Sequence, residues 1–261
     1  MTSLLDDSPS CVMDVLRGER STRPLPDTST AAQLRGALEE SLTVLLGVDP
    51  RDEPITVRAS SLRQVGTTSE GLSPHGPVRG ILVNQALRLL CAGVAIDDVY
   101  GDTLVAWRAE VGENYLTGYI DQLEHDDVAR LRADVEAHWV TLKRSLGSLS
   151  NWWLPRTSLR AYQRLASGNV ILRDMVDLMM GTTTSDLASV VILDVTTSPL
   201  DEGAERVMRY HALVQTLRTG TVPLRTSMFS TGTGELWSVD VDHELLARSV
   251  ADVLGVVEGR A

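Results

Sequence analysis

The hydrophobic pattern of this chain changes period near its middle, and this change constrains the fold more than any other feature. Residues before Trp152 place apolar side chains three and four positions apart, which is the spacing of amphipathic helices. From Asn169 onward, short apolar runs bounded by turn-forming residues alternate with further helical segments. A helical N-terminal half followed by this alternation predicts an α/β or α+β fold with a small mixed sheet flanked by helices.

The same spacing predicts the individual elements. Helices are expected over residues 30–46, 78–91, 97–119, 126–146, 201–219 and 243–257, with a short one at 11–16. Strands are expected over residues 169–180, 190–195, 224–230 and 235–241, with a short strand or helix lead-in at 55–57. Turn formers follow one another over residues 64–77 and predict a loop. We expect an N-terminal arm and helix over 1–50 and one domain over 51–261.

Composition narrows the classes of partner and compartment. The formal net charge is −11, which argues against a uniformly basic nucleic-acid binder and favours a protein partner, while a local basic groove for DNA stays open. The two cysteines, Cys11 and Cys91, exclude a disulfide framework supplied by this chain. The chain has no apolar run long enough to span a membrane, and its first residues lack a signal-peptide pattern. We therefore expect a cytoplasmic protein.

Two aspartates interrupt apolar strand segments. Asp177 lies in Met-Val-Asp-Leu-Met-Met and Asp194 in Val-Ile-Leu-Asp-Val. On adjacent strands the two carboxylates would lie side by side, and each would raise the pKa of the other. A bound Mg²⁺ or Mn²⁺ would resolve this repulsion, polarise a phosphoryl oxygen and lower the pKa of a bound water. The alternative is that each aspartate has a structural role at the end of a strand.

Four segments, taken in order, resemble the motifs of the RecB-like branch of the PD-(D/E)XK nucleases. The segments are Gly80-Ile-Leu-Val-Asn84, Leu172-Arg-Asp-Met-Val-Asp177, Val191-Ile-Leu-Asp194-Val-Thr196-Thr197 and Arg206-Val-Met-Arg-Tyr210-His-Ala-Leu213. The resemblance spans residues 55–250 and implies a restriction-endonuclease-like core in the domain over 51–261. It also implies that Asp177, Asp194 and Asn84 occupy metal-binding positions. By the same resemblance Asp177, Asp194, Thr196 and Arg206 occupy catalytic ones.

Three of these positions depart from the family's pattern. Thr196 stands where active members carry a lysine that holds the attacking water, Asn84 stands for a histidine, and Arg206 stands for a glutamine. Threonine cannot supply a positive charge, and the only lysine of the chain, Lys143, lies on the long predicted helix 126–146. His211 could face the site, although packing in the core or on the surface is the commoner role. Losing one group that stabilises charge costs on the order of 10²–10³ in rate.

These observations lead to three hypotheses. The first is a catalytically degraded nuclease-fold protein that serves as a DNA-associated or scaffold subunit of a DNA-processing or defence complex. The second is an active Mg²⁺- or Mn²⁺-dependent deoxyribonuclease in which a relocated cation, Arg206 or Arg173, replaces the lysine. The third is a non-enzymatic α/β interaction module in which both aspartates are structural.

Overall fold

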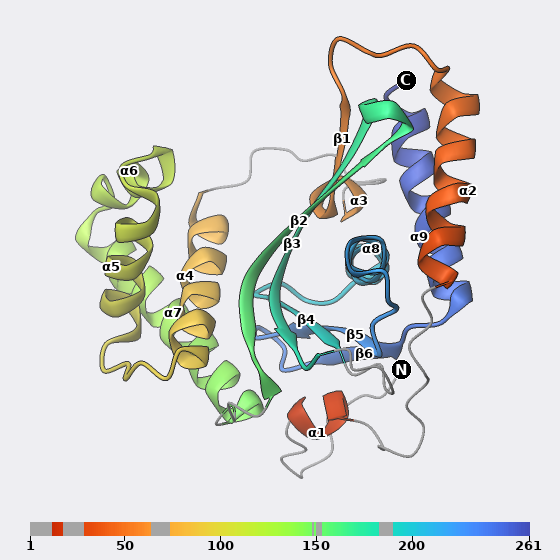
Figure 1. Cartoon of the computed structure of the whole chain (residues 1–261). Coiled ribbons are helices and arrows are strands. Elements are labelled where there is room, and N and C mark those ends of the chain that lie inside the picture. The colour runs from red at the N-terminus through yellow and green to blue at the C-terminus, as the bar shows by residue number, and fades with distance from the viewer. Residues whose placement is uncertain (1–11, 18–28, 64–73, 148, 150–152, 183–189) are drawn as a thin grey trace.

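The structure is a computed structural model that describes residues 12–17, 29–63, 74–147, 149, 153–182 and 190–261 (Figure 1). Its helices are α1 (Val12–Arg17), α2 (Ser29–Leu46), α3 (Ala59–Arg63), α4 (His75–Cys91), α5 (Val99–Val111), α6 (Tyr115–Asp121), α7 (His125–Leu146), α8 (Glu202–Thr219) and α9 (His243–Glu258). A short 3-10 helix covers Ala166–Gly168. Its strands are β1 (Ile55–Arg58), β2 (Arg156–Leu165), β3 (Val170–Met180), β4 (Val191–Thr196), β5 (Arg225–Ser230) and β6 (Leu236–Asp240).

One mixed sheet contains all six of these strands, and β3 pairs with three of them, β1, β2 and β4. β2 pairs antiparallel with almost the whole length of one edge of β3. The opposite edge of β3 is divided: β1 pairs parallel with residues 170–173, and β4 pairs antiparallel with residues 178–180. β5 then follows β4 in parallel, and β6 follows β5 antiparallel. Between β1 and β4 the edge of β3 is therefore forked at residues 174–177 (Figure 1).

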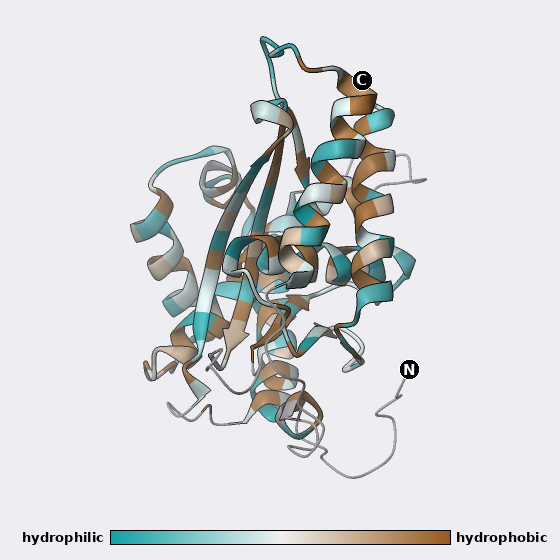
Figure 2. Ribbon diagram, turned by 45° about the vertical axis from the view of Figure 1, so that its right-hand side comes forward, coloured by the Kyte–Doolittle hydropathy of each residue, from teal (hydrophilic) through white to brown (hydrophobic). Residues whose placement is uncertain are grey.

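Helices cover both faces of this sheet, because each helix has one apolar side to bury. α4 and α7 pack on one face through Val83, Leu87, Leu142 and Leu146. α2, α8 and α9 pack on the other, where Leu38, Leu213, Tyr210 and Leu246 join the apolar residues of β1 and β3. α5 and α6 form an outer layer on α4 and α7 (Figure 1). The helices carry hydrophilic residues beside these hydrophobic ones, as amphipathic helices do (Figure 2).

Local sequence signals set the ends of the helix that bears on the site. The Asp201 side chain accepts the backbone N–H of Ala204 at 2.8 Å and begins α8. Gly220 ends α8 in the left-handed conformation, at φ 75°, where a side chain would be strained. The residues of α8 between these ends are buried along most of their length, since the helix lies between the sheet and α9.

The predicted α/β class, with a mixed sheet flanked by helices, is confirmed. From Asn169 onward, the predicted order of strand, strand, helix, strand, strand, helix is confirmed by β3, β4, α8, β5, β6 and α9. The prediction of one helix over 97–119 is wrong: Gly112, at φ 65°, ends α5, and Asn114 caps α6. The predicted loop at 64–77 lies mostly outside the described residues, and its last three residues begin α4.

Sequence patterning missed β2 altogether. The N-terminal α2, whose role the sequence left open, packs into the same apolar cluster as α8 and α9 through Leu34, Leu38 and Leu42. In the part of the chain that the structure describes, no helix combines the length and apolarity that crossing a membrane requires.

Candidate functional site

A buried group of polar side chains lies in the fork between β1 and β4. Asp177 comes directly before Leu178 on β3, and Asp194 comes directly after Leu193 on β4; Leu178 and Leu193 are opposed at the end of the β3–β4 pairing. The backbone N–H of Asp177 points at Asp194 Oδ1, with 3.4 Å between the nitrogen and the oxygen. The structure thus brings the two aspartates side by side, as the strand order predicted. Asp177 is buried, and the Asp194 side chain is 19% exposed.

Both carboxyl oxygens of Asp177 already accept hydrogen bonds. The side-chain amide of Asn84, on α4, donates to Oδ1 at 3.1 Å. The backbone N–H of Val195 donates to Oδ2 at 2.9 Å. Asn84 therefore reaches the pair from the opposite helical layer to α8, and it contributes an N–H donor there rather than an oxygen ligand.

A histidine supplies the positive charge of the group. His211 projects from α8, and its Nδ1 lies 2.8 Å from Oδ1 of Asp174 on β3. Its Nε2 lies 3.4 Å from Asp194 Oδ2, which is an ion-pair distance, although it does not form a well-directed hydrogen bond. Because the ring is 1% exposed, its charge interacts with the two carboxyl groups with little screening by water.

The electrostatics of the group follow from this geometry. Burial alone would lower the pKa of His211, but the carboxylates of Asp174 and Asp194 raise it well above its ordinary value. Burial, together with the charge of Asp194, raises the pKa of Asp177. Burial opposes ionisation of Asp194 as well, yet His211 and the neighbouring hydrogen-bond donors lower its pKa. Of the two carboxyl groups, Asp177 therefore holds a proton more readily, and Asp194 is the one that pairs with His211.

A tyrosine links β1 to β3 beside the fork. The hydroxyl of Tyr210 lies 2.9 Å from the carbonyl oxygen of Val57 on β1 and 3.1 Å from that of Arg173 on β3. Burial raises the pKa of Tyr210, so the hydroxyl keeps its proton and can donate to either carbonyl. Tyr210 and His211, consecutive on α8, thus hold the backbone and the acidic side chains of the same short region.

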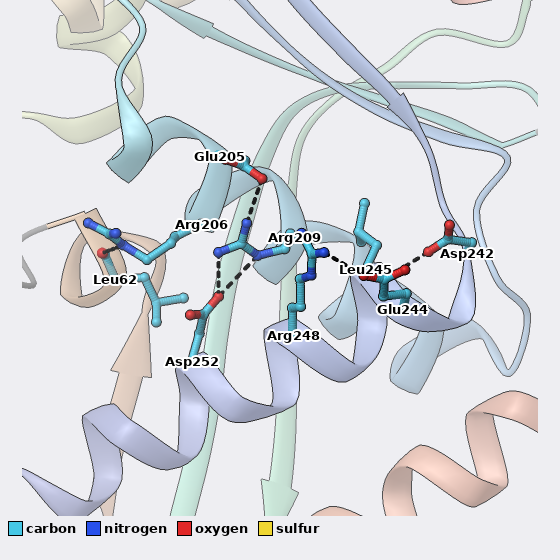
Figure 3. Close-up of polar contacts among 9 residues, drawn as sticks. All are labelled: Leu62, Glu205, Arg206, Arg209, Asp242, Glu244, Leu245, Arg248 and Asp252. Atoms are coloured by element: carbon cyan, nitrogen blue, oxygen red, sulfur yellow. Dashed lines mark hydrogen bonds and ion pairs between the residues drawn. The ribbon is translucent and has the colours of Figure 1, made fainter. Parts of the chain in front are cut away.

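The remaining predicted residues lie outside this group or at its margin. Thr196 is on β4, two residues beyond Asp194, and its hydroxyl accepts the backbone N–H of Ser198 at 3.2 Å. Arg206 is directed at α3, where its Nε donates to the carbonyl oxygen of Leu62 at 3.0 Å (Figure 3). Neither Arg206 nor Arg173 is among the described groups that shift the pKa of Asp177 or Asp194.

Lys143, on α7, lies over the ring of Trp139, with 5.8 Å between its Nζ and the ring centroid. It therefore packs against an aromatic side chain of its own helix, one turn away.

The group does not fit a divalent cation. Magnesium and manganese take several oxygen ligands, whereas the oxygens of Asp177 are bonded to N–H donors and Asp194 faces His211. Among the described residues, no three carboxylate, histidine or cysteine side chains are arranged to hold a metal ion. The side chain placed to offset the negative charge of Asp194 is His211, whose pKa the neighbouring carboxylates raise.

The sequence pattern did not identify two residues of this buried group. Asp174 was not singled out, although it lies three residues before Asp177 and is 3% exposed. His211 was expected to pack in the core or on the surface, and it does both pack and face the site. The available signal was a charged residue at an inward position of a strand, since Leu172 and Val176 on either side of Asp174 are buried.

Comparison with known proteins adds little to this picture. No protein-family model matches the sequence, and a search of curated proteins found no match. One solved structure that matches is the crystal structure of SSO0001, with 10% sequence identity and a TM-score of 0.35, covering 88% of this chain and 86% of that chain. A TM-score of this size is too low to carry an argument about this chain.

Proposed function

We propose that this chain is a catalytically inactive protein of RecB-like nuclease type. It would act as a DNA-associated or scaffold subunit of a DNA-processing or defence complex. The observation that carries the proposal is the position of His211, whose two ring nitrogens face Asp174 and Asp194. The motif resemblance supplies the family, and the buried ion pair is the reason to expect no hydrolysis.

Phosphodiester hydrolysis needs an activated water and a positive charge beside the phosphoryl oxygens. His211 is a poor general base, because both of its nitrogens face carboxylates and its pKa is raised. Asp177 is also poorly placed to act as a base, since both of its carboxyl oxygens already accept hydrogen bonds from N–H groups. The side chain at the lysine position, Thr196, brings no charge.

The active-nuclease alternative would need a cation free to approach the substrate at the two aspartates. Arg206, the leading candidate from the sequence, extends to α3 instead. The interaction-module alternative shares the structural role of the aspartates with our proposal. It differs only in predicting no association with nucleic acid, so binding rather than cleavage separates the two.

The proposal is tested by incubating the purified chain with single- and double-stranded DNA in Mg²⁺ and in Mn²⁺. We expect no cleavage by the native chain or by Asp194→Ala. Calorimetric titration with MnCl₂ should also give no heat of site binding, because the carboxyl oxygens are already engaged. Metal-dependent cleavage that Asp177→Asn and Asp194→Asn both abolish, while the surface control His243→Asn leaves it intact, would overturn the proposal in favour of an active nuclease.

A further inference from the structure

Two hollows on the described surface contain several arginines, and they differ in how those arginines are paired. One hollow, of about 210 Å³, lies between α8, β6 and α9. There Arg209 bonds Glu205 and Asp252, and Arg248 bonds Glu244 (Figure 3). Each of these guanidinium groups is neutralised by the protein itself, and the wall also holds Asp240 and Asp242, so this hollow offers no positive charge to a ligand.

The second hollow, of about 330 Å³, lies where β1, β2 and β3 meet. It is lined by Arg58, Ala59, Ser60, Arg160, Arg173, Asp174 and Met175. None of its three arginines has a carboxylate within ion-pair distance in the described part of the chain. The one acid in the wall, Asp174, is buried and paired with His211, so the charge exposed to a ligand is that of the arginines.

The strand register extends this hollow into a continuous surface, which we call the arginine face: Arg58, Arg160, Tyr162, Arg164, Arg173 and Met175. Arg173 lies opposite Arg58 on one side and Tyr162 on the other, and Arg160 lies opposite Met175. Because directly opposed residues of paired strands point to the same side of a sheet, these side chains share one face. All six are exposed.

An aromatic ring stands among these charges. Tyr162 is 52% exposed and Met175 is 50% exposed, which is unusual for apolar side chains in the middle of strands. The guanidinium carbon of Arg173 lies 5.6 Å from the centroid of the Tyr162 ring. This contact holds Arg173 next to the ring without neutralising its charge.

We propose that the arginine face binds a single-stranded nucleic acid, with phosphates on Arg58, Arg160 and Arg173 and a base stacked on Tyr162. Unpaired arginines are the groups that hold phosphate oxygens in pairs of hydrogen bonds. An exposed ring between them adds stacking, which a single strand can use because its bases are free to unstack. In a duplex the faces of the bases are stacked on one another and cannot stack on Tyr162. An acidic peptide would bind the arginines but has no base to stack on the ring.

This inference takes its ligand class from the proposed function, but it assigns binding to a surface separate from Asp177 and Asp194. The six residues of the arginine face are exposed, whereas Asp177 is buried with both carboxyl oxygens hydrogen-bonded, to Asn84 and Val195, and Asp194 faces His211. Binding on the arginine face therefore does not require the acidic pair. When binding is measured in EDTA, which removes divalent cations, any metal-dependent cleavage cannot affect the result.

The test is fluorescence anisotropy of a labelled oligothymidylate of about 16 nucleotides with the full chain in EDTA. R58Q/R160Q/R173Q should bind at least about tenfold more weakly, and the slope of log affinity against log salt should fall by about 2. Tyr162→Leu should also weaken binding by roughly tenfold, with the salt slope unchanged, while Tyr162→Phe keeps the affinity. The matched control R130Q/R144Q/R248Q removes the same charge from exposed arginines on other surfaces and should change the affinity less than about twofold.

Three outcomes would overturn the inference. No binding by the native chain is the first. An equal loss in the matched control is the second, since it would mean that only net charge matters. The third is that a DNA duplex, or polyglutamate added as a competitor, binds as tightly as the single strand, with an affinity that Tyr162→Leu does not change. Cleavage in Mn²⁺ would instead contradict the proposed function and leave the binding result in EDTA unaffected.

Discussion

The two faces of β3 differ in whether their charged side chains have partners of opposite charge. Asp174 points toward α8, where it is buried against His211. Its neighbours in sequence, Arg173 and Met175, point the other way and are exposed. On the buried face charges are offset by partners, because an unpaired ion in a medium of low dielectric constant is very costly. On the exposed face water tolerates unpaired charges, so arginines can remain there for a ligand to meet.

The largest effect is expected from removing the cation of the buried face. His211→Leu should lower the free energy of unfolding by about 3–5 kcal/mol, because Asp174 and Asp194 lose the group that offsets their charge. Urea denaturation measures this change. Adding Asp174→Asn to His211→Leu should recover part of the loss, whereas the exposed control His243→Leu should stay within about 0.5 kcal/mol of the native chain. A small effect of His211→Leu would show that the ion pair is not formed.

A second comparison uses neighbouring residues. Asp174→Asn should cost about 2 kcal/mol of unfolding free energy, because it removes the charge from a buried hydrogen bond to His211. Met175→Gln, one residue later on the exposed face, should change stability by less than about 0.5 kcal/mol. Equal costs at the two positions would contradict the difference between the faces.

The third prediction concerns pH. The pKa of His211 is raised in the folded chain, so its contribution to stability is complete below pH 6.5 and is lost as pH rises toward the folded pKa. Between pH 7 and 8 the unfolding free energy should therefore fall, by about 1 kcal/mol. The raised pKa of Asp177 acts in the same direction. The lowered pKa of Asp194 adds no slope here, because that carboxyl is ionised in both states above pH 5.

This pH window avoids two other groups. Burial lowers the pKa of His138, so the pH dependence that this group causes lies below about pH 6.5. There it makes the unfolding free energy rise with pH, which is opposite to the effect of His211. Burial raises the pKa of Cys91 to about 11, so its effect begins where the thiol of the unfolded chain titrates, near pH 8.5. His211→Gln should reduce the slope between pH 7 and 8 to the part that Asp177 contributes. A slope that is unchanged in this variant would show that His211 does not cause it.

The smallest effect belongs to the exposed face. R58Q/R160Q/R173Q should leave the free energy of unfolding, measured in urea, within about 0.5 kcal/mol of the native value, since these side chains are exposed and have no carboxylate partner among the described residues. A destabilisation as large as that of Asp174→Asn would mean that the arginines stabilise the sheet and are not free to bind a ligand. The same variant is the one used in the binding test, so this measurement also shows that it is folded.

The juxtaposition of Asp177 and Asp194 could be predicted because it depends on local pattern. Each aspartate interrupts a short apolar strand, and two strands joined by a turn pair with each other. β2 could not be predicted as easily. Arg160, Tyr162 and Arg164 alternate with Ala161 and Gln163, and this alternation is weak because neither intervening residue is strongly apolar. The arginine face was missed for the same reason.

The sequence by itself determined the class of fold, the order of the C-terminal elements and the pairing of the two aspartates, because periodicity acts over a few neighbouring residues. Only the tertiary structure decided that His211 offsets the charge of Asp174 and Asp194. This depends on how α8 packs on the sheet, and His211 lies more than thirty positions from Asp174 in the chain. It also decided that three strands far apart in the chain bring Arg58, Arg160 and Arg173 to one surface. Long-range packing, unlike local spacing, leaves no periodic trace in the sequence.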